Sequence, residues 1–291
     1  MSNVAKGTAN AHLHEWQTDA LAAASGTNAV IEGDDATTNT AVPTSRFANY
    51  TQILTKVPRV SKTQREVTSA GRRDELSYQI AKSGREIKRD LETSLTSRNN
   101  ARAGDSASAA LMAGIGAWLF GNVVKPTANS SGTTAVITSG APTTPVSAGT
   151  AGTFLESDLK SCIRLCWDDG GDPGVVMVGA FNKMQASAFA GIGTQFRDVQ
   201  PSAVAPGSIV GAADLYVSDY GTHQIVANRF QQAAEVYVLD LEYWSVDYLY
   251  GFTQEPLAKT GLSDRVLIST QVTLAALNPS ASGKIFTVTT S

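Results

Sequence analysis

The longest regular spacing of hydrophobic residues lies between Arg72 and Arg98, and it predicts a helix. Its apolar positions follow one another at intervals of three or four residues: Leu76, Ile80, Gly84, Ile87, Leu91 and Leu95. This period places them in one narrow stripe on about 40 Å of helix, with charged residues on the other faces. A helix with one narrow stripe lies along a domain on one side and leaves its opposite side for solvent or neighbouring molecules.

Two runs in the first seventy residues alternate large and polar side chains, which predicts strands. They are residues 14–19 and residues 50–60, and Pro58 in the second run suits only an edge strand or a bulge. Residues 28–49 between them are polar and contain Gly33 in a turn-forming context. Together they predict a long two-stranded loop that projects from the body. Because such a hairpin is marginal alone, we expect it to rest on a partner surface.

The rest of the chain alternates between helical and strand spacing. Helices are expected at residues 107–124, 154–167 and 183–189. Strands are expected at residues 175–178, 213–217, 223–228, 234–241, 244–250 and 265–277. This mixture predicts an α+β fold.

Residues 126–155 form a segment of a different kind. After Lys125 it contains no charged residue until Glu156, and consists mostly of Thr, Ser, Gly, Ala and Pro. Disordered tracts usually combine low hydrophobicity with high charge, which this segment lacks. The composition therefore leaves two alternatives, a flexible neutral loop or short surface strands.

The composition points to a chain that associates with other chains. Only 17% of its 291 residues are charged, although 42% are hydrophobic, and soluble domains usually contain about 25% charged residues. A surface with so few charges has little protection against association. The formal net charge of -3, without any basic block, argues against a high-affinity nucleic-acid reader.

The sequence indicates neither a membrane span nor a secretory signal. The longest apolar stretch, residues 111–124, is shorter than the roughly 20 residues that cross a bilayer and contains three glycines. The first thirty residues include His, Glu, Trp and Asp and lack a basic start followed by an apolar run. We therefore expect no membrane contact and a cytoplasmic origin.

The sequence gives only weak evidence for a cofactor or metal site. Cys162 and Cys166 lie on one face of an expected helix, which suits two free buried thiols better than a disulfide. His12 and His14 point the same way from a strand but lack a third ligand at suitable spacing. The turn with Asp168, Asp169 and Asp172 lacks the register of a calcium loop and fits a helix-terminating turn. No glycine-rich phosphate loop is present, so we expect no metal and no cofactor.

One enzymatic interpretation has to be weighed. Ser157 with Lys160, Ser218-Asp219-Tyr220 and Lys259-Thr260-Gly261 occur in the chain order of a serine β-lactamase or penicillin-binding protein. In such enzymes the first serine is the nucleophile and lysines activate it. The match is loose, because Tyr220 stands where an asparagine belongs and such enzymes act outside the cytoplasm. A serine acyl-enzyme hydrolase is therefore the alternative function.

Several short strings, taken in chain order, carry a stronger resemblance. They are HEWQTD at 14–19, EG at 32–33, NYTQ at 49–52, VS and TQ at 60–64, DEL and YQ at 74–79, KRDLE at 88–92, VG and FNK at 178–183, YVSD at 216–219, NRF at 228–230, LD and YW at 239–244, and LAKTG at 257–261. In this order they resemble the major capsid proteins of tailed bacteriophages, which carry the Hong Kong 97 capsid fold.

The resemblance implies a domain organisation. Residues 1–70 would form the remnant of an N-terminal arm and the extended loop. Residues 71–125 and 240–280 would form the peripheral domain, with residues 72–98 as its spine helix. Residues 126–239 and 281–291 would form the axial domain. The resemblance assigns no role to the neutral segment 126–155.

The resemblance also implies a function. The chain would be a structural protein without enzymatic activity, whose pentamers and hexamers close into an icosahedral head around double-stranded DNA. Its partners would be other copies of itself, a portal, packaged DNA bound without sequence preference, and scaffolding, protease or decoration proteins. The head would assemble in the cytoplasm of the bacterial host and the protein would reside in the virion.

Two groups of residues are the candidate assembly contacts. In the extended loop and its root, we expect Tyr50, Ile53, Leu54 and Val57 to be buried against an adjoining subunit. At a tip formed by residues 255–265, we expect Glu255, Lys259, Asp264 and Arg265 to bridge between chains, with a solvated loop as the alternative. Lys56 and Lys62 are candidates by position alone for a covalent cross-link to an asparagine of another subunit.

Overall fold

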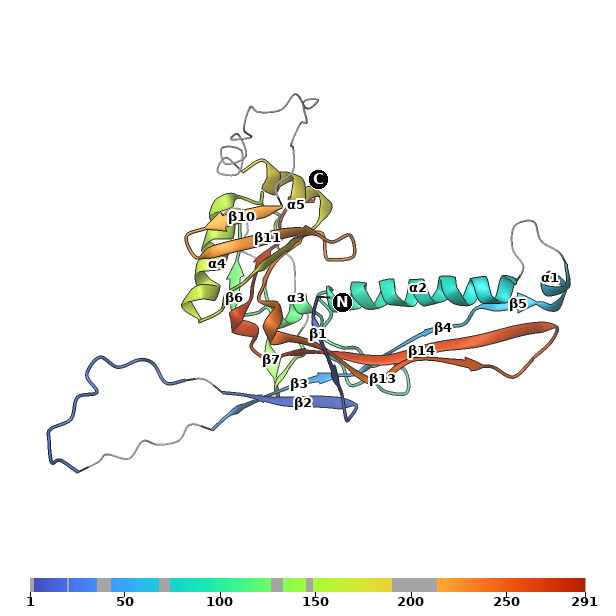
Figure 1. The fold of residues 1–291 in the computed structure, drawn as a ribbon, viewed down its shortest axis with the longest axis horizontal. Helices are drawn as coiled ribbons and strands as arrows, with labels where there is room; N and C mark the ends of the chain where they lie inside the picture. Colours follow the sequence, from blue (N-terminus) through green and yellow to red (C-terminus); the bar gives the residue numbers. More distant parts are fainter. Residues whose placement is uncertain are drawn as a thin grey trace, which may run out of the picture.

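The molecule has a lobe, a long arm that leaves the lobe on one side, and a loop that projects on the other side (Figure 1). The computed structural model describes residues 3–19, 21–35, 43–67, 74–126, 133–144, 149–189 and 214–290, and the statements below refer to these residues. Helices and strands are mixed, as the α+β prediction requires.

A five-stranded sheet forms the arm. Its strands are β1 (Ala5–Thr8), β13 (Trp244–Pro256), β14 (Ser263–Ala276), β4 (Gln52–Lys56) and β5 (Arg59–Ser61). The first four are neighbours in this order, and β5 extends the sheet by pairing with the distal end of β14. Pro58 separates β4 from β5, which fits the predicted position of this proline at a sheet edge. The antiparallel β13–β14 hairpin runs the length of the arm (Figure 1).

Helix α2 (Glu75–Leu95) lies along this sheet and confirms the predicted long helix. The Asp74 carboxylate caps its start by accepting a hydrogen bond from the Leu76 backbone nitrogen at 3.0 Å. The predicted stripe is fully buried only at Ile87, Leu91 and Leu95, the end that meets the lobe. Along the arm the stripe is half-buried, because a thin sheet covers only one side of the helix.

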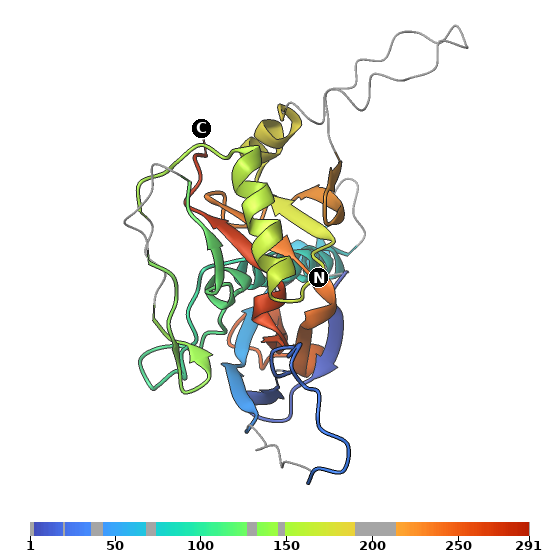
Figure 2. The same cartoon turned by 90° about the vertical axis from the view of Figure 1, so that its left-hand side faces the viewer.

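A six-stranded sheet forms the centre of the lobe. In spatial order it contains β10 (Leu215–Ser218), β11 (Gly221–Ala227), β9 (Val175–Val178), β12 (Glu235–Leu239), β15 (Gly283–Phe286) and β6 (Asn122–Val124). Helix α4 (Glu156–Asp168) covers one face (Figure 2), and α5 (Ala180–Ser187) follows β9. The expected helices at 154–167 and 183–189 and the strand at 175–178 are confirmed, with small shifts of the helix ends.

This sheet separates two hydrophobic cores. Val236 and Val238 of β12 face the core under α4, whereas Tyr237 and Leu239 face the core that contains the end of α2. Such alternation follows from the two-residue period of a strand. The six-stranded sheet therefore links the lobe to the arm through its second face.

The remaining elements are short. Strands β2 (Leu13–Thr18) and β3 (Ser45–Tyr50) form the hairpin from which the loop projects, and β7 (Ile137–Thr138) pairs with β8 (Ala141–Pro142). Helix α1 is Lys62–Glu66, and two single-turn helices lie at Leu241–Tyr243 and Pro279–Ala281. In the neutral segment 126–155, the described part thus contains short strands, one of the two alternatives drawn from its composition.

The helix expected at residues 107–124 was a wrong prediction. Only α3 (Ile115–Trp118) is helical, and β6 follows it. The Asn49 side chain donates to the Ala113 carbonyl at 3.2 Å and accepts from the Ala113 nitrogen at 2.8 Å, so this backbone is bonded to a distant residue instead of to a helical turn. A Cβ atom at Gly114 would lie 2.5 Å from the Ser97 carbonyl oxygen, which shows how closely the extended chain passes the end of α2.

The strands of the arm are longer than expected. β13 continues six residues beyond Tyr250, where register shifts near Gly251 interrupt the alternation on which the prediction rested. The expected strand at 213–217 begins outside the described residues, and its described part is in β10. Among the described residues, no helix combines the length and the apolar character needed to cross a bilayer.

Candidate assembly surfaces

Aromatic side chains fix the root of the extended loop to the body. Trp16 of β2 donates from its indole nitrogen to the Ala276 carbonyl at 2.9 Å. Its ring centre lies 5.5 Å from that of the buried Trp118, and Phe47 of β3 meets the same ring edge-on at 5.7 Å. These contacts hold the β2–β3 hairpin at a defined angle, so the loop beyond it starts from a rigid base.

The loop itself, residues 19–44, exposes hydrophobic side chains. Leu21 is 100% exposed, Val30 84% and Ile31 77%, and they lie on a segment that projects away from the body (Figure 1). A turn at its far end is closed by a hydrogen bond from the Asp34 nitrogen to the Ile31 carbonyl, with Gly33 at a φ of 86° that favours glycine. The loop offers apolar groups that its own chain does not cover.

The four candidate residues at the root of the loop divide into two pairs. Tyr50 and Leu54 are half-buried and pack against the core of their own chain. Ile53 and Val57 are 56% and 47% exposed. Because side chains alternate along β4, Ile53 and Val57 lie on the sheet face opposite to Leu54 and α2. Only the second pair is available to another molecule.

The tip of the arm contains a network of charges within one chain. The Lys259 ammonium lies 2.7 Å from Asp264, and Arg65 of the α1 segment forms an ion pair with the same carboxylate. The hydrogen bond from Lys259 has the largest effect on the Asp264 carboxylate, followed by that from Arg65, and both hold its pKa below the usual range. Arg265 donates to the Ala258 carbonyl at 3.1 Å and to the Thr260 hydroxyl at 2.6 Å. These contacts tie the β13–β14 turn to α1 and give the tip a fixed shape.

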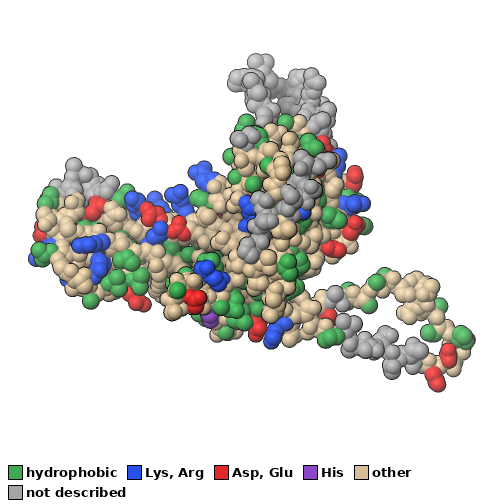
Figure 3. All heavy atoms as spheres, turned by 180° about the vertical axis from the view of Figure 1, so that it is seen from behind, with side chains coloured by type: hydrophobic (Ala, Val, Ile, Leu, Met, Phe, Trp, Pro, Cys, Tyr) green, Lys and Arg blue, Asp and Glu red, His purple; other side chains and the backbone are tan. Residues whose placement is uncertain are grey.

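The tip still offers groups to its surroundings. Leu262 in the β13–β14 turn is 80% exposed, and Glu255 is exposed on the same hairpin. Seen from behind, the arm carries basic and acidic side chains that are interspersed over its length (Figure 3). Lys259, Asp264 and Arg265 are thus brought together by the fold, while Glu255 lies apart from their network.

The two lysines considered for cross-linking differ in environment. Lys56 lies 2.8 Å from Asp90 of α2, and the hydrogen bond to this carboxylate raises the pKa of the lysine. Lys62 is exposed at the start of α1. The Lys56–Asp90 pair joins the edge strand β4 to the helix, so Lys56 has a structural contact of its own.

The sequence did not reveal a buried charge cluster between the lobe and the arm. Lys284 and Glu235 are both fully buried, and the Lys284 ammonium lies 3.7 Å from a Glu235 carboxylate oxygen. Arg98, just beyond α2, lies 3.6 Å from the same oxygen, and Lys284 donates to the Gly116 carbonyl at 2.6 Å. A lysine inside the apolar strand GKIF was the one available signal, because buried charges need partners.

The residues of the hydrolase alternative are not assembled into a site. Lys160 pairs with Glu156 on α4 at 2.9 Å, and Ser218 is hydrogen-bonded to His223 at 2.7 Å. Lys259 lies at the far end of the arm, whereas α4 and β10 lie in the lobe (Figure 1). A nucleophilic serine needs its activating base within hydrogen-bond reach, so the acyl-enzyme arrangement is absent from these residues.

The other candidates have structural roles. His12 bonds to the Thr51 hydroxyl and the Ala103 carbonyl, and His14 lies 2.8 Å from Asp247. Cys162 and Cys166 are free and buried, as expected, and contact with Cys166 together with burial raises the pKa of the Cys162 thiol. Asp168 ends α4, which confirms the helix-terminating turn. Within the described ranges, no group of His, Cys, Asp or Glu residues is arranged to hold a metal ion.

Comparisons with known proteins agree with the architecture. A family model described as SU10 major capsid protein matches residues 1–289. The major capsid protein of Escherichia phage Phieco32 is 31% identical over 324 aligned residues, which span 99% of this chain and 89% of that protein. The match to the phage protein therefore involves nearly the whole chain.

Solved capsid structures share the fold. The capsid of Cyanophage A-1(L) superposes with a TM-score of 0.63 at 13% identity, over 99% of this chain and 92% of that chain. An encapsulin of Synechococcus elongatus PCC 7942 superposes with a TM-score of 0.55 at 12% identity, over 99% and 86%. At these identities the likeness concerns the fold alone, and it confirms the predicted Hong Kong 97 type of capsid fold.

Proposed function

Because the chain belongs to the SU10 major capsid protein family, we propose that the surfaces described above are the contacts through which its copies build a phage head. The protein is a major capsid protein, a structural subunit of an icosahedral shell. The family match over residues 1–289 is the observation that carries this conclusion. In a closed symmetric assembly each subunit touches several neighbours, so modest contacts add up to a stable shell.

The first proposed contact is the extended loop, which lies on an adjoining subunit. Its exposed Leu21, Val30 and Ile31 support this assignment, since each side chain gains about 25 cal/mol for every Å² of apolar surface that it buries. Part of that gain is lost in ordering the loop. A loop with these residues is poorly suited to water and well suited to a neighbour.

The second proposed contact is the outer face of β4. Ile53 and Val57 are the members of the predicted set that are exposed enough to meet another subunit. Tyr50 and Leu54 serve the same contact indirectly, because they hold β4 and the loop root against the body of their own chain. We therefore assign direct contact to Ile53 and Val57 alone.

The third proposed contact is the tip of the arm, where subunits meet around three-fold positions. Lys259 and Asp264 form an ion pair in one chain, so their proposed role is to hold the tip in shape and to present a shared charge to a neighbour. The exposed Glu255 completes the contact, and Arg265, which donates to Ala258 and Thr260 of its own chain, holds the turn in place. Exposed ion pairs are individually weak, and several of them are needed for a useful effect.

The two proposed domains correspond to the two large sheets. The arm with α2, β13 and β14 is the peripheral domain, and the lobe with the six-stranded sheet is the axial domain, which gathers around five-fold and six-fold axes. β6 pairs with β15 in the sheet of the lobe, so we place the boundary before Asn122 instead of after Lys125. The loop of residues 19–44 is the extended loop.

The proposed contact with packaged double-stranded DNA is loose and independent of sequence. Residues 72–98 contain seven basic and five acidic residues. Within the observed α2, Lys82, Arg85, Lys88 and Arg89 are balanced by Glu75, Glu86, Asp90 and Glu92. Tight binding to phosphates needs an excess of Lys and Arg, which this helix lacks.

We further propose a purely structural role without enzymatic activity. The shell would assemble in the cytoplasm of the bacterial host, together with a portal and with scaffolding, protease or decoration proteins where the phage encodes them. The serine hydrolase alternative loses its support, since Lys259 lies in the β13–β14 turn at the tip of the arm while Ser157 and Ser218 lie in the lobe.

Electron microscopy of the purified protein tests the proposed function. Uniform polyhedral shells with five-fold and six-fold capsomers are the expected result. A chromogenic β-lactam assay on the same sample is the second measurement. Monomers that hydrolyse the β-lactam, with no shells under any solution condition, would overturn the proposal.

A further inference from the structure

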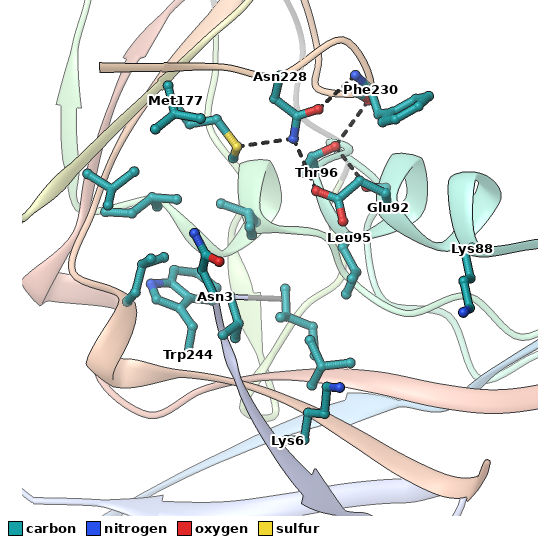
Figure 4. A pocket seen from close by; sticks show the side chains of 18 of the residues that line it. Asn3, Lys6, Lys88, Glu92, Leu95, Thr96, Met177, Asn228, Phe230 and Trp244 are labelled. Carbon is teal, nitrogen blue, oxygen red and sulfur yellow. Dashed lines mark hydrogen bonds between the residues drawn. The ribbon is translucent and has the colours of Figure 1, made fainter. Parts of the chain in front are cut away.

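An apolar groove opens where the arm meets the lobe. It has a volume of about 890 Å³ and lies between α2, β13 and the six-stranded sheet (Figure 4). Leu95, Met177, Leu239, Trp244 and Val246 line its inner part. Such a volume is within the roughly 300–1,000 Å³ of pockets that bury a small ligand, so it has room for several aliphatic side chains.

The polar groups on the wall of the groove already have partners. Asn228 donates to the Glu92 carboxylate at 3.1 Å, and the Thr96 hydroxyl donates to the Glu92 carbonyl at 2.9 Å (Figure 4). A guest therefore finds few open hydrogen-bonding groups inside. This favours an apolar guest over a polar small molecule, which would need convergent donors and acceptors.

The mouth of the groove is positively charged. Lys6 of β1 and Lys88 and Arg89 of α2 line it and are exposed. The Lys88 ammonium lies 5.8 Å from the centre of the Phe252 ring, and the Arg89 guanidinium lies 5.4 Å from that of Phe230. The guest should therefore combine an apolar part with acidic residues next to it.

The extended loop has this chemistry. Val30 and Ile31 are followed directly by Glu32, and Asp34 and Asp35 come next in the chain. Residues 19–44, with Asp19 included, contain four acidic residues and no basic residue. The loop thus exposes apolar side chains next to acidic ones. The groove is apolar inside and has basic residues at its mouth.

We propose that the groove of each subunit receives Val30 and Ile31 from the extended loop of a second copy, with Glu32 and Asp34 paired to Lys88 and Arg89. This inference rests on the proposed assembly of the chain and names the receiving site. Within one chain the loop projects in the direction opposite to α2 (Figure 1), which lines the groove, so a loop that fills the groove has to come from another copy. The 26 residues of the loop reach roughly 40 Å when each half is extended.

Interchain disulfides in assembled shells test this placement. The variant Ile31→Cys with Phe252→Cys puts one thiol on the loop and one at the groove, where Phe252 is 40% exposed. The native Cys162 and Cys166 are fully buried and do not interfere. The matched control is Ile31→Cys with Met184→Cys, because Met184 is 70% exposed on α5 in the lobe.

Mild oxidation of the first variant should give a ladder of covalently linked chains on a non-reducing gel. The yield should exceed that of the control by about tenfold, since a disulfide needs Cβ atoms within about 4.5 Å. Shells that form but remain unlinked, or that link equally in both variants, would overturn the groove assignment and leave the proposed function standing. Failure of the unmodified protein to form shells would instead overturn the proposed function.

Charge exchange gives an independent readout. Lys88→Glu with Arg89→Glu should lower the yield of shells, and adding Glu32→Lys with Asp34→Lys in the same chain should restore it, because opposite charges again face each other. A combined variant that assembles no better than the first would contradict the pairing. Heat denaturation of the unassembled subunits separates a loss of assembly from a loss of folding.

Discussion

The Lys284 ammonium lies 3.7 Å from the Glu235 carboxylate, and neither side chain is exposed to solvent. β12 and β15 carry the two residues in the lobe, while Arg98 approaches the same carboxylate from the arm. Burial lowers the pKa of Lys284, and the Glu235 charge opposes this effect. The Lys284–Glu235 pair therefore lies inside the lobe, and the attraction between Glu235 and Arg98 joins the lobe to the arm.

The pair predicts a strong effect when one partner is removed. Glu235→Gln should destabilise the unassembled subunit by about 3–5 kcal/mol, because it leaves a buried ammonium without its counter-charge. The double variant Glu235→Leu with Lys284→Met should recover much of this loss, since both buried charges disappear. Urea unfolding followed by tryptophan fluorescence measures both values, and equal losses in the two variants would contradict the interpretation.

The extended loop should be needed for shells and unnecessary for folding. Removal of residues 20–43 takes away Leu21, Val30 and Ile31 and leaves Ser45 in its β3 pairing with Thr18, so the subunit should remain soluble with an unchanged unfolding transition. Shell formation should be lost, because the apolar contact on the neighbour is gone. Light scattering and electron microscopy of the variant check this, and normal particles would count against the role of the loop.

The tip of the arm should respond to charge reversal. Lys259→Glu places one like charge beside Asp264 and removes one of its two cationic partners. Shells of this variant should become sensitive to salt or fail to close. The swap Lys259→Glu with Asp264→Lys restores one ion pair and serves as the control. Assembly of Lys259→Glu that equals the wild type at every salt concentration would remove the tip from the list of contacts.

The Asp247 carboxylate should contribute to stability in acid. Burial acts to raise its pKa, but hydrogen bonds from His14 and Ser245 hold the pKa below its usual value. A lowered native pKa means that the contribution is present above about pH 4, the unfolded pKa, and is lost as the pH falls through the native pKa. Asp247→Asn should therefore flatten the loss of stability below about pH 4, measured by urea unfolding at a series of pH values, whereas an unchanged slope would contradict this assignment.

The spacing of hydrophobic residues predicted those helices and strands whose structure depends mainly on residues nearby in the chain. The stripe from Leu76 to Leu95 identified α2, and the alternation in residues 244–250 and 265–277 identified β13 and β14. Residues 107–124 have helical spacing as well, but Asn49, more than sixty positions earlier in the chain, binds the Ala113 peptide group and holds this segment extended. No property of the segment itself indicates that competing contact.

The sequence predicted which residue types form the candidate contacts, but only partly the direction in which their side chains point. Ile53 and Leu54 are both large aliphatic residues in one strand, and their sequence context is the same. The position of α2 over one face of β4 is what turns Leu54 inward and leaves Ile53 outside. Likewise, Glu235 and Lys284 are separated by almost fifty residues, so their proximity follows from the pairing of β12 with β15.

The geometry around Glu235 has a mechanical consequence. The Arg98 guanidinium and the Lys284 ammonium lie 3.6 and 3.7 Å from one carboxylate oxygen of Glu235, farther than in a short charged hydrogen bond. Attraction between charges decreases slowly with separation, whereas a hydrogen bond weakens steeply once its angle changes. The contact between Arg98 and Glu235 therefore tolerates small changes of angle. Hydrogen bonds from Tyr237 to Thr96 and from Asn228 to Glu92 limit how far the end of α2 can shift against the lobe.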